Sequence, residues 1–379
     1  MTEQGIYSSF MDWLKNTWIG LPESEFKEET IKQRFSVEEA EFLTGFPFRK
    51  TPLDELATLK GMTEKELTER LDPMAKKGLV WKGQKKGKVR YSLNEIFFSL
   101  YRSTFWPMLH TDHMERVAPP ANQYFLHGMM EDFGKVEYKG LRTLPIHETI
   151  QPGTTVKPYE DVVKLLDKFE YYTVSACPCR QRKKLDPGFE DSKKPMEVCL
   201  HFDDLGHYIV ENEMGREITR EETEAVLKKA ADAGLVHGLS NWQEKPDTIC
   251  NCDKEYCIWF ETYYQMDHHK SLDESNFEVL GKGETCKGCG LCVKRCPMEA
   301  LSMVDYPEAD RSLNKKALVP KLELTGCLGC GVCVVKCPTK SLTLVPRAVT
   351  IDPPQSVYKW STQYLEDVKK GMPMKRQKN

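Results

Sequence analysis

Eight of the fourteen cysteines in this 379-residue chain fall into two matching runs near its C-terminal end. One run begins at Cys286 and reads C-K-G-C-G-L-C-V-K-R-C-P, and the other begins at Cys327 and reads C-L-G-C-G-V-C-V-V-K-C-P. Residues 286–304 and 327–345 are identical at 10 of 19 positions at an offset of 41, which indicates a duplicated unit. Three thiolates spaced by two residues can wrap one face of a metal cluster, so the runs predict metal ligation.

The repeated pattern C-x2-C-x2-C-x3-C-P resembles that of bacterial-type dicluster ferredoxins, in which the last cysteine of each run ligates the cluster of the other run. The resemblance, assigned to residues 276–350, implies a duplicated ββ/α fold and two 4Fe-4S clusters. It implies one cluster on Cys286, Cys289, Cys292 and Cys337, and a second on Cys327, Cys330, Cys333 and Cys296. Zinc sites explain neither the C-x3-C-P tails nor the repeat, so we expect iron-sulfur clusters. Residues 306–322 add a charged insertion that we expect to shield a cluster or form a docking surface.

Six further cysteines lie in a middle module, and none lies before Cys177. They are Cys177, Cys179, Cys199, Cys250, Cys252 and Cys257. Because cytosolic thiols are kept reduced, such a group favours a metal centre over disulfides. We expect a third iron-sulfur cluster held by four of the six, with Arg180 and either Arg182 or Lys183 offsetting its negative charge. Structural zinc with His201 as a ligand, and a redox-active thiol pair without metal, are the alternatives.

Residues 36–93 carry repeated helix signals followed by a hairpin pattern. Capping boxes at Ser36 and Thr63 and the pair Thr51-Pro52 predict three short helices. Residues 78–93 alternate as two strands around a basic turn. This order resembles a winged helix-turn-helix domain, whose third helix, here 64–74, would enter the major groove of DNA. Acidic residues on that helix and Pro73 within it favour a protein-docking role over DNA binding.

A capping box at Thr219 predicts a further helix that ends at Gly234, with a strand after it. Together these signals predict a multidomain α+β chain. The predicted parts are an N-terminal winged-helix-like region (1–95), a linking segment (96–160), the cysteine-rich module (161–275), the dicluster domain (276–350) and a tail (351–379) with an amphipathic helix over 357–368. The sequence lacks a signal-peptide pattern and a membrane-length apolar run, so we expect a cytoplasmic protein. The net charge of -3 is too small to indicate a particular class of binding partner.

The sequence carries no dinucleotide fingerprint, P-loop or nucleophile elbow. We therefore expect an electron-transfer protein or subunit of a larger complex that relays single electrons to or from a partner redox enzyme, in an anaerobic setting, rather than a stand-alone enzyme. Two alternatives remain: a redox-sensing winged-helix transcription regulator, and an oxidoreductase with an active-site cluster in the middle module.

Overall fold

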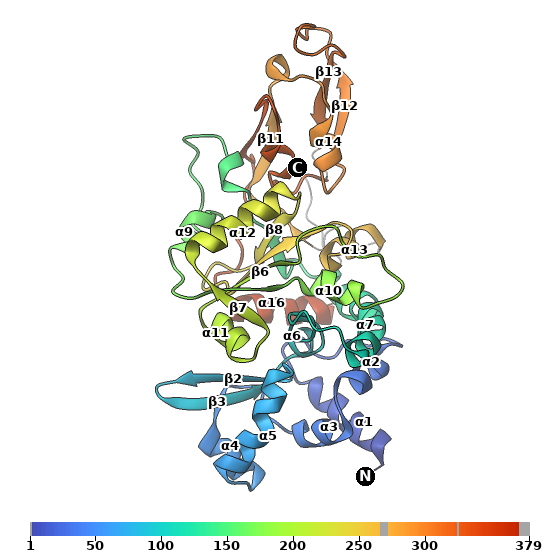
Figure 1. Cartoon of the computed structure of the whole chain (residues 1–379), viewed down its shortest axis with the longest axis vertical. Helices are drawn as coiled ribbons and strands as arrows, with labels where there is room; N and C mark the ends of the chain where they lie inside the picture. The colour runs from blue at the N-terminus through green and yellow to red at the C-terminus, as the bar shows by residue number, and fades with distance from the viewer. Residues whose placement is uncertain (1, 266–271, 324–325, 371–379) are drawn as a thin grey trace. The chain divides into compact units, whose positions relative to one another are not determined.

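The computed structural model describes residues 2–265, 272–323 and 326–370, which fold as two compact units of mixed α+β structure (Figure 1). Unit 1 comprises residues 1–133 and 171–219, and unit 2 comprises residues 134–170 and 220–379. In the described part of the chain, no helix combines the length and the apolar character needed to cross a bilayer. The expected α+β class is confirmed, whereas the bounds of the five predicted parts stay predictions.

Unit 1 begins with helices around a small antiparallel sheet of order β1-β3-β2. The helices are α1 (Glu3–Leu14), α2 (Lys27–Arg34), α3 (Val37–Leu43), α4 (Leu53–Lys60) and α5 (Glu64–Lys76), and the strands are β1 (Thr51–Pro52), β2 (Val80–Lys85) and β3 (Lys88–Leu93). Both predicted capping boxes form, because Ser36 and Thr63 each accept the amide of a glutamate three residues on, and that glutamate accepts the cap amide. Lys86 and Gly87 make the hairpin turn at positive φ.

Two details of this region differ from the sequence expectation. Pro52 is not in the first turn of α4 but precedes it, and Thr51 pairs with Tyr91 in the sheet instead of capping the helix. Helix α5 also continues through Pro73 to Lys76. Pro73 has no N–H to donate within the helix. Its carbonyl still accepts the amide of Lys77, so the following turn closes.

The rest of unit 1 is a helical segment followed by three antiparallel strands in the order β6-β5-β7. The segment, part of the predicted linking region, contains η1 (Phe97–Arg102), α6 (Ser103–Phe105), α7 (Asp112–Tyr124) and η2 (Phe125–Met129), with α8 (Met130–Lys135) at its end. The strands are β5 (Tyr172–Ala176), β6 (Glu197–Phe202) and β7 (Gly215–Ile218), with helices α10 (Pro178–Lys184) and α11 (Asp203–Glu211) between them.

Unit 2 holds four strands in the order β10-β4-β8-β9, together with the C-terminal cysteine repeat. The strands are β4 (Leu141–Thr143), β8 (Val236–Ser240), β9 (Thr248–Cys252) and β10 (Leu272–Asp273). The helices outside the repeat are η3 (His147–Thr149), α9 (Val162–Leu166), α12 (Arg220–Asp232), α13 (Ile258–Gln265) and α16 (Val357–Lys370). The strand expected after Gly234 and the helix expected in the tail are therefore both present.

The cysteine repeat folds as two equivalent halves that exchange strands. The first half contains β11 (Phe277–Gly281), η4 (Gly283–Thr285), α14 (Leu291–Arg295) and β12 (Leu301–Asp305), and the second contains β13 (Leu318–Leu322), α15 (Val332–Val335) and β14 (Leu342–Pro346). Strand β11 pairs with β14 and β12 pairs with β13, so each two-stranded sheet takes one strand from each half. Phe277, Val279, Leu301, Leu342 and Leu344 form the apolar core between them.

Tyr208 on α11 joins the N-terminal helices and hairpin to the rest of unit 1. Its ring stacks on Trp81 at a centroid distance of 4.5 Å, and its hydroxyl lies 3.0 Å from the carbonyl oxygens of Ala75 and Val80. Burial raises the pKa of Tyr208 far above its usual range, so the hydroxyl stays protonated and donates.

We expect Tyr208→Phe to lower the free energy of unfolding by about 1–2 kcal/mol, because it leaves buried carbonyls with one donor fewer. Chemical denaturation followed by tryptophan fluorescence measures this. Tyr358→Phe, at an exposed position of α16, is the control and should change nothing. Equal stabilities for the two variants would contradict the role given to the Tyr208 hydroxyl.

Candidate metal centre

Two hollows in the C-terminal repeat are each lined by four cysteines drawn from both halves. The first, with an open space of about 320 Å³, is lined by Cys286, Cys289, Cys292 and Cys337. The second, of about 340 Å³, is lined by Cys296, Cys327, Cys330 and Cys333. The structure thus brings together the two predicted sets of four, each with one cysteine from the opposite half. We call these hollows site 1 and site 2; which thiolates bind iron stays a prediction.

Glycines allow the cysteine loops to curl tightly around each site. Gly288 and Gly329 occupy equivalent places in the two halves, both at positive φ. A Cβ atom at Gly329 would lie 2.0 Å from the carbonyl oxygen of Phe277, and one at Gly288 would lie 2.2 Å from the Oδ1 atom of Asn314. The need for glycine at these two positions therefore comes from close packing as well as from the backbone angle.

Backbone amides donate to the cysteine sulfurs in a repeated pattern. The amide of Gly288 lies 3.4 Å from the Sγ atom of Cys286, and the amide of Gly329 lies 3.4 Å from that of Cys327. The amide of Ala300 lies 3.3 Å from the Sγ atom of Cys296. Such donors stabilise the negative charge of thiolates and are among the features that set the reduction potential of an iron-sulfur cluster.

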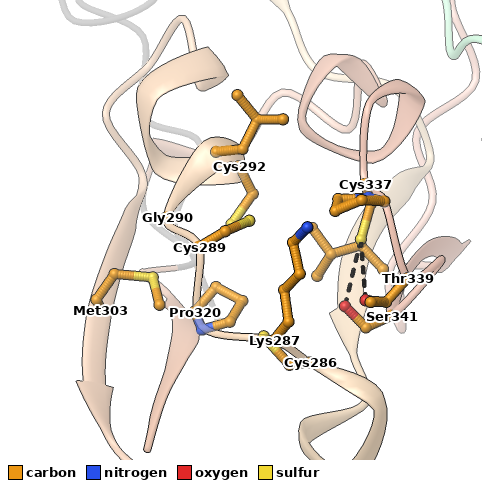
Figure 2. Close-up of a pocket in the computed structure, with 13 residues that line it drawn as sticks. Cys286, Lys287, Cys289, Gly290, Cys292, Met303, Pro320, Cys337, Thr339 and Ser341 are labelled. Atoms are coloured by element: carbon orange, nitrogen blue, oxygen red, sulfur yellow. Dashed lines mark hydrogen bonds between the residues drawn. The ribbon is translucent and has the colours of Figure 1, made fainter. Parts of the chain in front are cut away.

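The two sites differ in how their sulfurs are surrounded. Burial raises the pKa of Cys330 to about 12 in site 2, and raises that of Cys292 to about 11 in site 1. Burial also acts to raise the pKa of Cys337, but hydrogen bonds from Ser341 and from the backbone of Thr339 and Leu342 together outweigh it, and the pKa falls below its usual value. Figure 2 shows the Ser341 and Thr339 side chains pointing at the Cys337 sulfur, with the Ser341 hydroxyl 3.3 Å away.

The insertion over residues 306–322 forms part of the wall of site 1. Strands β12 and β13 extend as a hairpin, and Met303 and Pro320 from these strands line the hollow (Figure 2). Beyond the strands, Asn314 packs against Gly288 and bonds the carbonyl of Leu318 at 2.8 Å. The segment therefore covers the Gly288 loop of site 1, and shielding is one of the two roles that the sequence predicts for it.

Three of the middle cysteines lie in unit 1. Cys199 on β6 packs in an apolar cluster with Phe98 and Trp106. Cys177 precedes α10 and Cys179 lies within it, and the two thiols are close enough to hydrogen-bond, which together with burial raises the pKa of Cys177. His201, the proposed zinc ligand, bonds the Ser175 hydroxyl through its Nε2 atom at 2.9 Å, and burial lowers its pKa well below the usual value.

A buried polar chain in unit 1 ends on Cys179. The Tyr101 hydroxyl lies 3.0 Å from the Cys179 sulfur, the Arg182 Nε atom lies 2.7 Å from that hydroxyl, and Arg182 also bonds Asn122. Arg180, Arg182 and Lys183 are each only 1% exposed. Tyr101 and Asn122 carried no sequence signal, because nothing in their spacing relates them to the cysteines.

The other three middle cysteines lie in unit 2 and are neighbours. Cys250 and Cys252 are two residues apart on β9, and Cys257 follows the turn that begins at Asp253. Hydrogen bonds to Cys250 and Cys257, together with burial, raise the pKa of Cys252 well above its usual value. Helix α13 starts next, and its Tyr264 donates to the carbonyl of Pro297, the residue after Cys296 of site 2. Over the described residues, no three His, Cys, Asp or Glu side chains already surround a single metal-ion position.

The close packing at Gly329 makes a prediction about site 2. We expect Gly329→Ala to abolish one cluster, lowering iron by about four atoms per chain, because the added methyl group cannot fit against Phe277. Gly87→Ala in the hairpin turn is the control: Gly87 has a similar positive φ, but no atom lies within 4 Å of the added carbon. Iron analysis after anaerobic purification measures the difference, and equal iron in the two variants would contradict the packing argument.

Comparison with known proteins agrees with this geometry in the repeat. Residues 285–343 match the family profile of the 4Fe-4S dicluster domain. No curated protein matches the chain. The match supports no winged-helix assignment for residues 36–93, which stays a prediction, and it leaves the third centre untested. The chain thus carries, near its C-terminus, a 4Fe-4S dicluster domain, which implies two 4Fe-4S clusters and iron-sulfur electron transfer.

Proposed function

We propose that this protein relays single electrons between a low-potential donor and a partner redox enzyme, through the two clusters of residues 276–350 and a third centre in the middle module. The observation that carries the proposal is the pair of adjoining hollows, each lined by four cysteines. Thiolates that occupy every ligand position of a cubane leave no iron open for substrate, so such clusters serve electron transfer. Catalysis then belongs to the partner enzyme.

The crossed ligand sets can be tested by removing one sulfur. We expect Cys337→Ser to destabilise the site 1 cluster and spare the site 2 cluster, because only site 1 is lined by Cys337. Paramagnetic resonance of the reduced protein should then show one cluster in place of two interacting ones. Ser341→Ala, which removes a hydrogen bond to the same sulfur and no ligand, is the control and should keep both clusters.

A result in which Cys337→Ser keeps both cubanes would refute the crossed assignment. If the variant loses both clusters, circular dichroism shows whether it has also lost its folded state. Cys296→Ser provides the reciprocal measurement for site 2.

For the third centre, we propose Cys250, Cys252 and Cys257 as thiolate ligands, with a further donor completing the set. Their mutual proximity supports this choice, as does the contact from Tyr264 on the following helix to Pro297 beside site 2. We leave Cys199 out of this set, since it lies in unit 1 in a cluster with Phe98 and Trp106.

Iron counting tests the third centre. We expect about twelve irons per chain after anaerobic purification, which corresponds to three cubanes, and about eight in Cys252→Ser. Cys199→Ser should retain about twelve. About eight irons in the unmodified protein would reject a third cluster, and one zinc per chain would identify the centre as structural zinc.

The N-terminal helices and hairpin serve, we propose, to dock a protein rather than DNA. The exposed positions of α5 include Glu64, Glu66 and Glu69, whose carboxylates would repel phosphates in a major groove. The transcription-regulator alternative therefore has less support than the relay.

A further inference from the structure

Site 1 has an exposed cysteine, whereas site 2 has none. Cys289 of site 1 is exposed, while the cysteines of site 2 are buried or half-buried. The amide of Ile146 bonds the carbonyl of Cys330 at 3.1 Å, and Tyr264 reaches Pro297 on the same site. An external redox partner therefore has its direct approach at site 1.

The cations near site 2 are engaged within unit 2. Lys254 pairs at 2.9 Å with Glu299, which lies three residues after Cys296. Arg295, next to Cys296, donates to the carbonyls of Ala231, Asp232 and Val332. These charges hold the repeat against α12 and the loop before α13, and so contribute little to attracting another molecule.

The cations around site 1 have a different role. Lys287 lines the hollow itself, and Lys340 lies between the lining residues Thr339 and Ser341 (Figure 2). Lys315 and Lys316 follow Asn314, which packs on the Gly288 loop. All four lysines are exposed, and within the described residues none of them forms an ion pair with a carboxylate.

The surrounding segments share this bias. Residues 282–294, 305–323 and 338–341 contain eight Lys or Arg against five Asp or Glu, and one of these lysines, Lys321, pairs with Glu323 at 3.7 Å. Uncompensated like charges at one face cost free energy in an isolated molecule, and they attract an acidic surface over about a Debye length of 8–10 Å.

We propose that this face, centred on Cys289 and bordered by Lys287, Lys315, Lys316 and Lys340, docks an acidic one-electron carrier protein. The inference rests on the proposed relay function and adds the point of exchange and the charge of the partner. Exposed lysines suit a transient encounter, because they steer association while staying hydrated. A nucleic acid would be attracted by the same charges, but it does not exchange electrons with a redox centre. The exposed cluster ligand at the middle of the face therefore favours an electron carrier.

The test uses the full chain, reduced anaerobically by dithionite and mixed with oxidised flavodoxin, an acidic carrier. Each exchange oxidises one reduced cluster by one electron and converts the flavin quinone to its semiquinone, with the proton taken from water. The patch variant is the triple Lys315→Glu, Lys316→Glu, Lys340→Glu, which leaves the cysteine loops intact. The control triple, Lys229→Glu, Lys359→Glu, Lys369→Glu, makes the same charge change at exposed positions of α12 and α16.

At an ionic strength of about 0.01 M we expect the patch variant to transfer electrons to flavodoxin about tenfold more slowly than the unmodified chain, and the control triple to stay within about twofold. The difference should shrink at about 0.5 M salt. With cytochrome c, a basic carrier, the patch variant should be unimpaired. Iron content of every variant confirms that its clusters are intact.

The proposal is overturned if both triples slow flavodoxin equally, or if the patch triple leaves its rate unchanged. It is also overturned in favour of a nucleic acid if the patch triple loses affinity for duplex DNA at low salt while its rate with flavodoxin holds. Failure of the reduced, iron-loaded chain to pass electrons to either carrier would instead reject the relay function, and the docking face with it.

Discussion

The exchange between the two halves of the cysteine repeat is the constraint on which the C-terminal domain depends. Strand β11 of the first half pairs with β14 of the second, and β12 pairs with β13, so neither half completes a sheet alone. The same exchange occurs in the sulfurs, because Cys296 and Cys337 each line the hollow of the other half. Backbone pairing and metal ligation therefore favour the same arrangement, and a cluster bound at either site stabilises the contact between both halves.

Local chemistry made some of the fold predictable. The capping boxes at Ser36 and Thr63, the hairpin that ends at Leu93 and the helix that ends before Gly234 depend on residues a few positions apart. The eight-cysteine pattern works in the same way, since its spacing describes a loop around a cluster. At Pro52 the local preference for a proline in the first helical turn is not satisfied. Thr51 pairs with Tyr91 of β3, and Pro52 therefore precedes α4.

Long-range packing was not readable from the sequence. The six middle cysteines looked like one group in the sequence, yet Cys199 packs in a cluster with Phe98 and Trp106, far earlier in the chain. Nothing in their spacing distinguished it from Cys250, Cys252 and Cys257, which do lie together. The hydrogen bond from Tyr101 to Cys179 was hidden for the same reason, because it spans 78 positions.

The division of charge within unit 2 indicates a direction for electron flow. Beside site 2, Lys254 pairs with Glu299 and Arg295 donates to carbonyls of the same unit. Lysines beside site 1 are exposed, as is Cys289. Under the proposed relay, this exposed cysteine makes site 1 the point of exchange with an external carrier. The hydrogen bond from Tyr264 to Pro297 would then connect site 2 to the helix that follows Cys257.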